Sequence, residues 1–369
     1  MADLFDYISW RGDIPFSQVP FGKLDALMLA HLSYSLFDGL VSSDFSSVKT
    51  LEQLSNDFKK SSDYKERINI GFLINKRTAE LMEKCAASER FRNIKICGYK
   101  NIFDESKVEQ FAAMTFIIDD INFIAYRGTD DTLIGWQEDF NIAYLEEIPS
   151  QKDALVYFSE AAKNLKGKFI IAGHSKGGNL AVNTAVNCGE KNQNRIKTIY
   201  NFDGPGFFPD FFEKPEYKKI EDRLVSVYPE LSVVGMIFSH PEKYEIVESS
   251  GFAIMQHDAM TWQLMGNSFI NKKDFSKESK VFHKAFNRWI DKLTVEQRKK
   301  FVNALFEIIN ASGAKTNTEL EKNAFASSAK MFAAYTALDK QTKKEVKNIL
   351  SVLKGAVHSS LPFIKFADI

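Results

Sequence analysis

The sequence predicts an α/β fold in which a mostly parallel sheet is flanked by helices, because strand-like and helix-like patterns alternate through its middle. Short apolar or alternating runs bounded by Asp, Asn and Gly are typical of strands, whereas apolar residues three or four apart are typical of helices. Strand patterns occupy residues 93–103, 110–119, 122–128, 169–174, 196–202 and 223–228, and helical patterns occupy 153–165 and 179–189. This alternation favours a parallel sheet with helices on both faces and a site at the carboxyl ends of its strands.

Helical patterns also precede the first strand. Within residues 20–40 the apolar side chains recur at helical spacing, which predicts a covering helix; they are Leu24, Leu27, Met28, Leu32 and Leu36. His31 lies on this helix and is expected to be a partly buried residue without a catalytic role. Residues 45–92 are polar with helical patches and are expected to form an outer layer.

From about residue 276 the strand patterns stop and amphipathic helices begin. Three Thr-x-x-Glu/Gln pairs have capping-box spacing and predict three helix starts, at Thr294 with Gln297, Thr318 with Glu321 and Thr342 with Glu345. We therefore expect two units, a main domain over residues 1–275 with an N-terminal helical cover and a helical subdomain over residues 276–369. The second unit is expected to serve packing or partner contact rather than chemistry, since it lacks a cluster of titratable residues.

Composition excludes several classes of function. The 369 residues contain 48 Lys plus Arg and 48 Asp plus Glu, so the net charge does not favour nucleic acid as a partner. The three cysteines have no metal-ligand spacing and are expected to be reduced. The N-terminus does not have the pattern of a secretory leader, and no run of about 18 apolar residues predicts a transmembrane segment. A cytoplasmic protein of unknown oligomeric state is expected, without metal or cofactor.

The stretch FIIAGHSKGGNLA, residues 169–181, carries the main functional signal. An apolar run stops at a Ser between two glycines, Gly173 and Gly177, and is followed by a helical pattern. A strand, a sharp turn and a helix in this order form a nucleophile elbow, in which glycines two residues either side of Ser175 avoid collisions. A phosphate-binding loop is excluded because Asn179 stands where that motif requires Lys.

Four ordered segments resemble those of the class 3 lipases and, more closely, a bacterial group of lipase-like α/β-hydrolases of poorly defined substrate. The segments are FAAMTFIIDDINFIAYRGTDDTLIGWQEDF, GHSKGGNLA, IYNFDGPGF and QHDAMTW, and the resemblance covers about residues 95–265. It implies an α/β-hydrolase fold and leaves the C-terminal helices as an extension. It also implies that Thr129, in the Arg-Gly-Thr after an early strand, supplies an oxyanion donor.

An elbow serine needs a base and oxyanion donors. The residue after the nucleophile supplies one backbone N–H, here Lys176, and Thr129 supplies the second. The Lys176 side chain is expected to be exposed and solvated. The chain order Ser, acid, His leaves four candidate bases, His240, His257, His283 and His358. His174, next to the nucleophile, is expected to be at most a supporting residue of the site. We favour His257, which follows an apolar stretch in GFAIMQHDAMTW, a position to which the resemblance also points.

The acid of the triad stays open between Asp203 and Glu230. Asp203 ends a strand in IYNFDGPGF, at the edge where the elbow lies, although Asp before Gly-Pro-Gly is also a turn former. In the class 3 lipases an Asp follows the later strand, and here Ser232 fills that position while Glu230 stands two residues earlier. We favour Asp203, with Ser232 as a hydrogen-bonding helper near the same imidazole.

These residues predict a serine hydrolase of the esterase or lipase type that cleaves a carboxylic ester through an acyl-enzyme. An acyltransferase with the same nucleophile and a non-catalytic scaffold with this fold are the alternatives. A lipid or smaller ester is the substrate that the resemblance implies. The segment DDTLIGWQEDFNIAYLEEI after Thr129 is expected to form a lid, a pocket wall or a plain connection.

Overall fold

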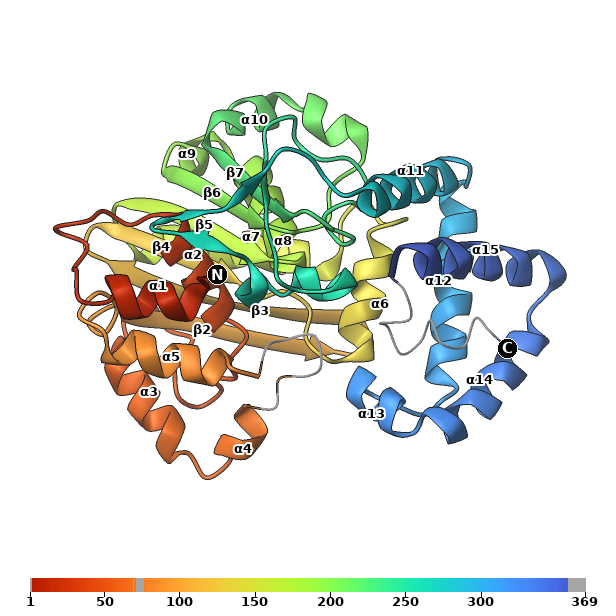
Figure 1. Cartoon of the computed structure of the whole chain (residues 1–369), viewed down its shortest axis with the longest axis horizontal. Helices are drawn as coiled ribbons and strands as arrows, with labels where there is room; N and C mark the ends of the chain where they lie inside the picture. Colours follow the sequence, from red (N-terminus) through yellow and green to blue (C-terminus); the bar gives the residue numbers. More distant parts are fainter. Residues whose placement is uncertain (1, 69, 71–75, 358–369) are drawn as a thin grey trace.

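A computed structural model describes residues 2–68, 70 and 76–357, and its centre is a mixed sheet (Figure 1). Within these residues the sheet has nine strands in the order β1-β2-β3-β4-β5-β6-β7-β8-β11. The strands are β1 Lys49–Thr50, β2 Lys95–Asp104, β3 Glu109–Ile118, β4 Ile121–Tyr126, β5 Lys168–His174, β6 Ile196–Phe202, β7 Leu224–Pro229, β8 Glu245–Val247 and β11 Asn271–Lys272. A short hairpin, β9 Leu264–Met265 with β10 Ser268–Phe269, stands apart from it.

The direction of the strands changes along the sheet. β4 to β8 pair in parallel, whereas β1 to β4 pair antiparallel and β11 returns antiparallel to β8. The predicted strands are all present, but the first three form an antiparallel meander because turns too short for a crossover helix connect them. The parallel half carries the alternation of strand and helix that predicted a parallel sheet flanked by helices, and this fold class is confirmed.

Helices cover both faces of the sheet (Figure 1). Two of them, α7 Pro149–Asn164 and α8 Lys176–Asn187, share one apolar core with the sheet, and α2 Lys23–Leu32 lies within the core of the other face. The expected covering helix is therefore present, although it ends at Leu32 and leaves Leu36 beyond it. The remaining helices of this part are α1 Leu4–Arg11, α3 Leu51–Lys60, α4 Tyr64–Arg67, α5 Thr78–Ala87, α6 Leu133–Asn141, α9 Glu190–Gln193 and α10 Pro215–Lys218.

Five helices form the C-terminal part, and Figure 1 shows them gathered at one side of the sheet. They are α11 Lys277–Asp291, α12 Val295–Asn310, α13 Asn317–Lys322, α14 Ala324–Ala337 and α15 Lys340–Val357. Apolar side chains of α11 and α12 share a hydrophobic cluster with α6 and with residues 233–238. The two parts therefore share a core, and the division of the chain into two units at residue 275 stays a prediction.

One of the three predicted helix caps is confirmed and two are wrong. Thr294 and Gln297 form the expected capping box of α12. Thr318 instead lies inside α13, whose cap is Thr316, two residues earlier. The same spacing occurs at Thr316 and Glu319, and the backbone N–H of Thr318 binds the carboxylate of Asp131.

The cap of α15 also lies earlier in the chain than the predicted Thr342. Asp339 accepts hydrogen bonds from the backbone N–H groups of Gln341 and Thr342, so Thr342 lies in the first turn of α15. A carboxylate at this place also interacts favourably with the helix dipole. Among the helices of the described ranges, none is both long and apolar enough to cross a membrane.

Candidate active site

Ser175 lies at the tight turn between β5 and α8. Its backbone has φ 57° and ψ −134°, a conformation that non-glycine residues rarely adopt. A Cβ atom at Gly173 would lie 2.1 Å from the carbonyl carbon of Gly177, and one at Gly177 would lie 2.1 Å from the carbonyl oxygen of Tyr126. Both positions therefore exclude side chains, and the local geometry is the one that the glycine pattern predicts.

The loop after β4 packs against this turn. A Cβ atom at Gly128 would lie 2.1 Å from the Tyr34 hydroxyl and 3.0 Å from Cβ of Ser175. This close approach places Thr129 at the pocket that Ser175 and Lys176 also line. The backbone N–H of Lys176 is at the first position of α8, where an N–H has no partner within the helix.

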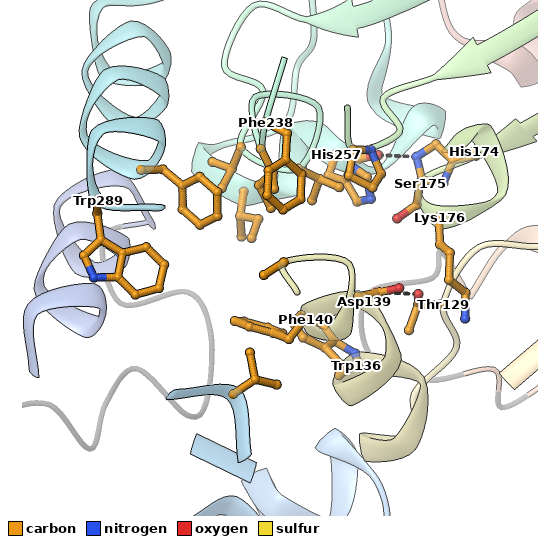
Figure 2. Close-up of a pocket in the computed structure, with 18 of the residues that line it drawn as sticks. Thr129, Trp136, Asp139, Phe140, His174, Ser175, Lys176, Phe238, His257 and Trp289 are labelled. Atoms are coloured by element: carbon orange, nitrogen blue, oxygen red, sulfur yellow. Dashed lines mark hydrogen bonds between the residues drawn. The ribbon is translucent and has the colours of Figure 1, made fainter. Parts of the chain in front are cut away.

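Asp139 of α6 holds the side chain of Thr129. The Thr129 hydroxyl donates to Oδ2 of Asp139 at 2.5 Å, and Figure 2 shows this pair at the edge of the pocket. Burial raises the pKa of Asp139 to about 6, while the nearby Lys176 lowers it in part. Asp139 is thus a buried carboxyl group beside Thr129 whose pKa lies closer to neutral pH than is usual, and the sequence analysis did not identify it.

His257 ends a short 3₁₀ helix, residues Ala253–His257, and pairs with Asp203. Its Nδ1 lies 2.6 Å from Oδ2 of Asp203, and the hydroxyl of Ser232 donates to the other carboxylate oxygen at 2.5 Å. Asp203 is fully buried directly after β6 with φ 51°, a region that Asp tolerates. Burial raises the pKa of Asp203, and the neighbouring His257 opposes that shift.

Glu230, the alternative acid, is not brought to the imidazole. It follows β7, and its side chain, 36% exposed, pairs with Lys272 at 3.4 Å. Asp203, by contrast, is held at the end of β6 beside β7, because its backbone N–H donates to the carbonyl oxygen of Val227. The structure therefore joins Asp203, Ser232 and His257 in one hydrogen-bonded chain and leaves Glu230 at the surface.

His174 holds the backbone of His257 in place through a hydrogen bond. Its Nε2 lies 2.7 Å from the carbonyl oxygen of His257, so it must donate there (Figure 2), and its Nδ1 accepts from the Tyr34 hydroxyl at 2.9 Å. Burial lowers the pKa of His174 well below its usual range, an effect to which His257 and His31 add. A neutral His174 thus fixes the backbone of the His257 loop. His31 is itself buried and contacts Thr78 at 3.1 Å, which agrees with the structural role expected for it.

The other candidate bases lie elsewhere. His240 is packed against His283, with ring centroids 4.8 Å apart, and burial lowers the pKa of His240 to about 4. His283 binds the carbonyl oxygen of Met236 at 2.9 Å. His240 and His283 are not among the residues that line the pocket of Ser175, and His358 lies outside the described residues.

The Lys176 side chain contradicts the expectation that it is exposed and solvated. It is fully buried, and its ammonium donates to Oε2 of Glu138 at 2.8 Å and to the backbone and side-chain oxygens of Gln110 at 2.6 and 3.0 Å. Figure 2 shows it directed away from the pocket. Glu138 also accepts from the backbone N–H groups of Gln110 and Ser150, so this ion pair ties the start of α8 to α6 and β3.

The substitution Glu138→Gln should destabilise the fold strongly. It removes the anion that compensates a buried ammonium, and breaking such a pair costs roughly 3–5 kcal/mol. Urea unfolding should show the loss as a lower midpoint. The matched control is Glu160→Gln, which breaks a pair with Lys100 whose carboxylate is 45% exposed and should change stability by less than about 1 kcal/mol. Equal midpoints for Glu138→Gln and wild type would show that the buried pair is not needed.

Ser175 and His257 line an apolar pocket with a cavity volume of about 130 Å³. Figure 2 shows Trp136 and Phe140 on one side and Phe238 on the other, with Trp289 at the end far from Ser175. The segment after Thr129 is thus a pocket wall, formed by α6. Within residues 2–68, 70 and 76–357, no group of His, Cys, Asp and Glu side chains is arranged to hold a metal ion.

Comparisons with known proteins place the chain in a family. Among solved structures, the M37 lipase is similar with a TM-score of 0.36 and 14% identity over 58% of this chain and 68% of that chain. The Rhizomucor miehei lipase in its propeptide complex has a TM-score of 0.29 and 18% identity over 43% and 57% of the two chains. No curated protein sequence matches the chain. The model of the Mbeg1-like family matches residues 85–307, which is more than half of the chain, and the chain therefore belongs to the Mbeg1-like family.

Proposed function

We propose that this protein is a serine hydrolase of the esterase or lipase type, which cleaves a carboxylic ester through an acyl-enzyme on Ser175. The observation that carries the proposal is the hydrogen-bonded chain from Ser232 through Asp203 to Nδ1 of His257, which ends in the same apolar pocket as Ser175. A buried acid that orients an imidazole beside an elbow serine is the arrangement that nucleophilic acyl transfer needs.

In the first half of the reaction, the Ser175 hydroxyl oxygen attacks the ester carbonyl carbon while Nε2 of His257 takes its proton. The negative charge that forms on the carbonyl oxygen is stabilised by the backbone N–H groups of Lys176 and Thr129. Asp203 accepts a hydrogen bond from Nδ1 of His257 and stabilises the imidazolium. His257 then gives its proton to the departing alcohol as the carbon–oxygen bond breaks, and the acyl group stays on Ser175.

In the second half, a water molecule takes the place of the alcohol next to His257. His257 takes a proton from the water as it attacks the acyl carbon, and returns it to Ser175 as the free acid leaves. Within the described residues, the hydrogen bonds of His257 join it to Asp203 and His174. The Ser175 hydroxyl must therefore turn toward Nε2 when substrate binds, and such tightening between free enzyme and substrate complex is common.

Ester turnover by the purified full-length chain tests the proposal. Wild type should hydrolyse p-nitrophenyl esters with a burst of p-nitrophenol equal to the enzyme concentration if deacylation is the slower half, and Ser175→Ala should lose turnover by several orders of magnitude. Product analysis with and without an added alcohol separates hydrolysis from acyl transfer. Equal turnover by wild type and Ser175→Ala would contradict the proposed nucleophile.

A further inference from the structure

The pocket next to Ser175 has a polar end and an apolar end. The carboxyl group of Asp139 and the imidazoles of His174 and His257 lie around Ser175, whereas the Lys176 ammonium is directed away from the pocket toward Glu138. Away from the serine the lining is aliphatic and aromatic, and Figure 2 shows Trp289 at that far end. A carboxylate, phosphate or ammonium on the substrate would lose its water there without a charged partner. The far end therefore fits an uncharged hydrocarbon chain.

The C-terminal helices build this apolar end. Trp289 comes from α11, and Phe301 and Val302 come from α12. They face α6, whose Phe140 ring packs on Phe306 of α12 with centroids 5.5 Å apart. The region that the sequence analysis assigned to packing or partner contact is thus a wall of the same pocket that Ser175 opens into.

The order of the reaction indicates which part of an ester occupies this space. The acyl group stays bound to Ser175 after the alcohol has left, so an enclosed apolar pocket suits the group that remains attached. The alcohol must leave and be replaced by water, so it needs an open path.

We propose that α11 and α12 form the distal wall of an acyl-chain-binding subsite, and that Trp289, Phe301 and Val302 determine the length of the acyl chain. The subsite takes an uncharged hydrocarbon chain. This inference rests on the proposed function, because the subsite selects among esters that are cleaved at Ser175.

The test uses p-nitrophenyl acetate, butyrate, octanoate, dodecanoate and hexadecanoate with the purified full-length chain. Each buried methylene should raise kcat/KM by about fourfold until the chain meets the wall, since burying one CH₂ contributes about 0.8 kcal/mol. Val302→Trp should block the far end and lower the dodecanoate-to-acetate ratio of kcat/KM by about tenfold or more. Trp289→Ala should do the opposite and raise the hexadecanoate-to-octanoate ratio.

A matched control separates blockage from damage to the helix. Val295→Trp makes the same change on α12 at a side chain that is 58% exposed, and its chain-length profile should equal that of wild type. The opposite shifts of Val302→Trp and Trp289→Ala cannot both arise from lost stability, and Trp289→Ala alone still decides the matter if Val302→Trp fails to fold.

Two outcomes would overturn the inference. One is a profile that neither variant shifts, and the other is a response to the length of the alcohol, in a series of acetate esters, instead of the acyl chain. Labelling of Ser175 by a small fluorophosphonate distinguishes these failures from failure of the proposed function. A labelled enzyme with an unshifted profile contradicts the subsite alone, whereas an unlabelled enzyme contradicts the hydrolase.

Discussion

The substitution His257→Ala is expected to lower ester turnover by about 10⁴-fold or more, because removal of a triad member leaves mainly binding and oxyanion stabilisation. His257 is the imidazole that Asp203 orients at 2.6 Å, and it lines the pocket with Ser175. Initial rates with a short p-nitrophenyl ester measure the effect, and the melting temperature shows that the fold persists.

The control for His257 is His240→Ala. His240 lies among Tyr228, Tyr244 and His283 and is not among the residues that line the pocket. We expect turnover to stay within about twofold of wild type, even if the loss of ring contacts lowers stability, because distant core changes act mainly on folding. If His240→Ala abolished turnover and His257→Ala did not, the assignment of the base would be wrong while a serine hydrolase would still be possible.

The substitution Asp203→Asn should lower turnover by about 10³- to 10⁴-fold. The side chain is nearly isosteric, so the fold should survive. An amide in place of the carboxylate no longer stabilises the imidazolium and can donate to Nδ1 of His257, which favours the tautomer that cannot accept the proton of Ser175. Ser232→Ala should have a smaller effect, because it removes one of the hydrogen bonds that hold Asp203 and leaves its charge in place.

Glu230→Gln is the matched control for Asp203→Asn. Glu230 is partly exposed and pairs with Lys272, so the substitution should change turnover little. A near-normal Asp203→Asn enzyme together with an inactive Glu230→Gln enzyme would transfer the role of the acid to Glu230.

Short-range patterns predicted the parts of the site that depend on local sterics. Gly173 and Gly177 indicate the turn at Ser175 because each would collide with backbone if it carried a Cβ atom. The helix cap at Thr294 was predicted for the same reason, since the capping box is made within four residues. Where the Thr-x-x-Glu spacing occurs twice in a few residues, as at Thr316 and Thr318, the local pattern could not choose between them.

Parts of the site that depend on distant partners could not be predicted. Lys176 resembles a solvated lysine until Glu138, which is 38 positions earlier in the chain, is brought beside it by the packing of α6 against the start of α8. Asp203 was favoured over Glu230 from its place at the end of a strand, but its contacts with His257 and Ser232 depend on the placement of β6 beside β7. The pocket wall formed by Trp289 and Val302 likewise arises from the return of the C-terminal helices onto α6, for which the sequence shows only an apolar face that needs a partner.

Labelling with a fluorophosphonate, followed by peptide mapping, tests the central claim most directly, because the reagent reacts with an activated serine whatever the natural substrate is. The folded full-length protein should gain one adduct on the peptide that contains Ser175. Heat-denatured protein and the Ser175→Ala variant should gain none, and His257→Ala should react far more slowly. Folded wild-type protein that gains no adduct on Ser175 would contradict the account of this protein as a serine hydrolase.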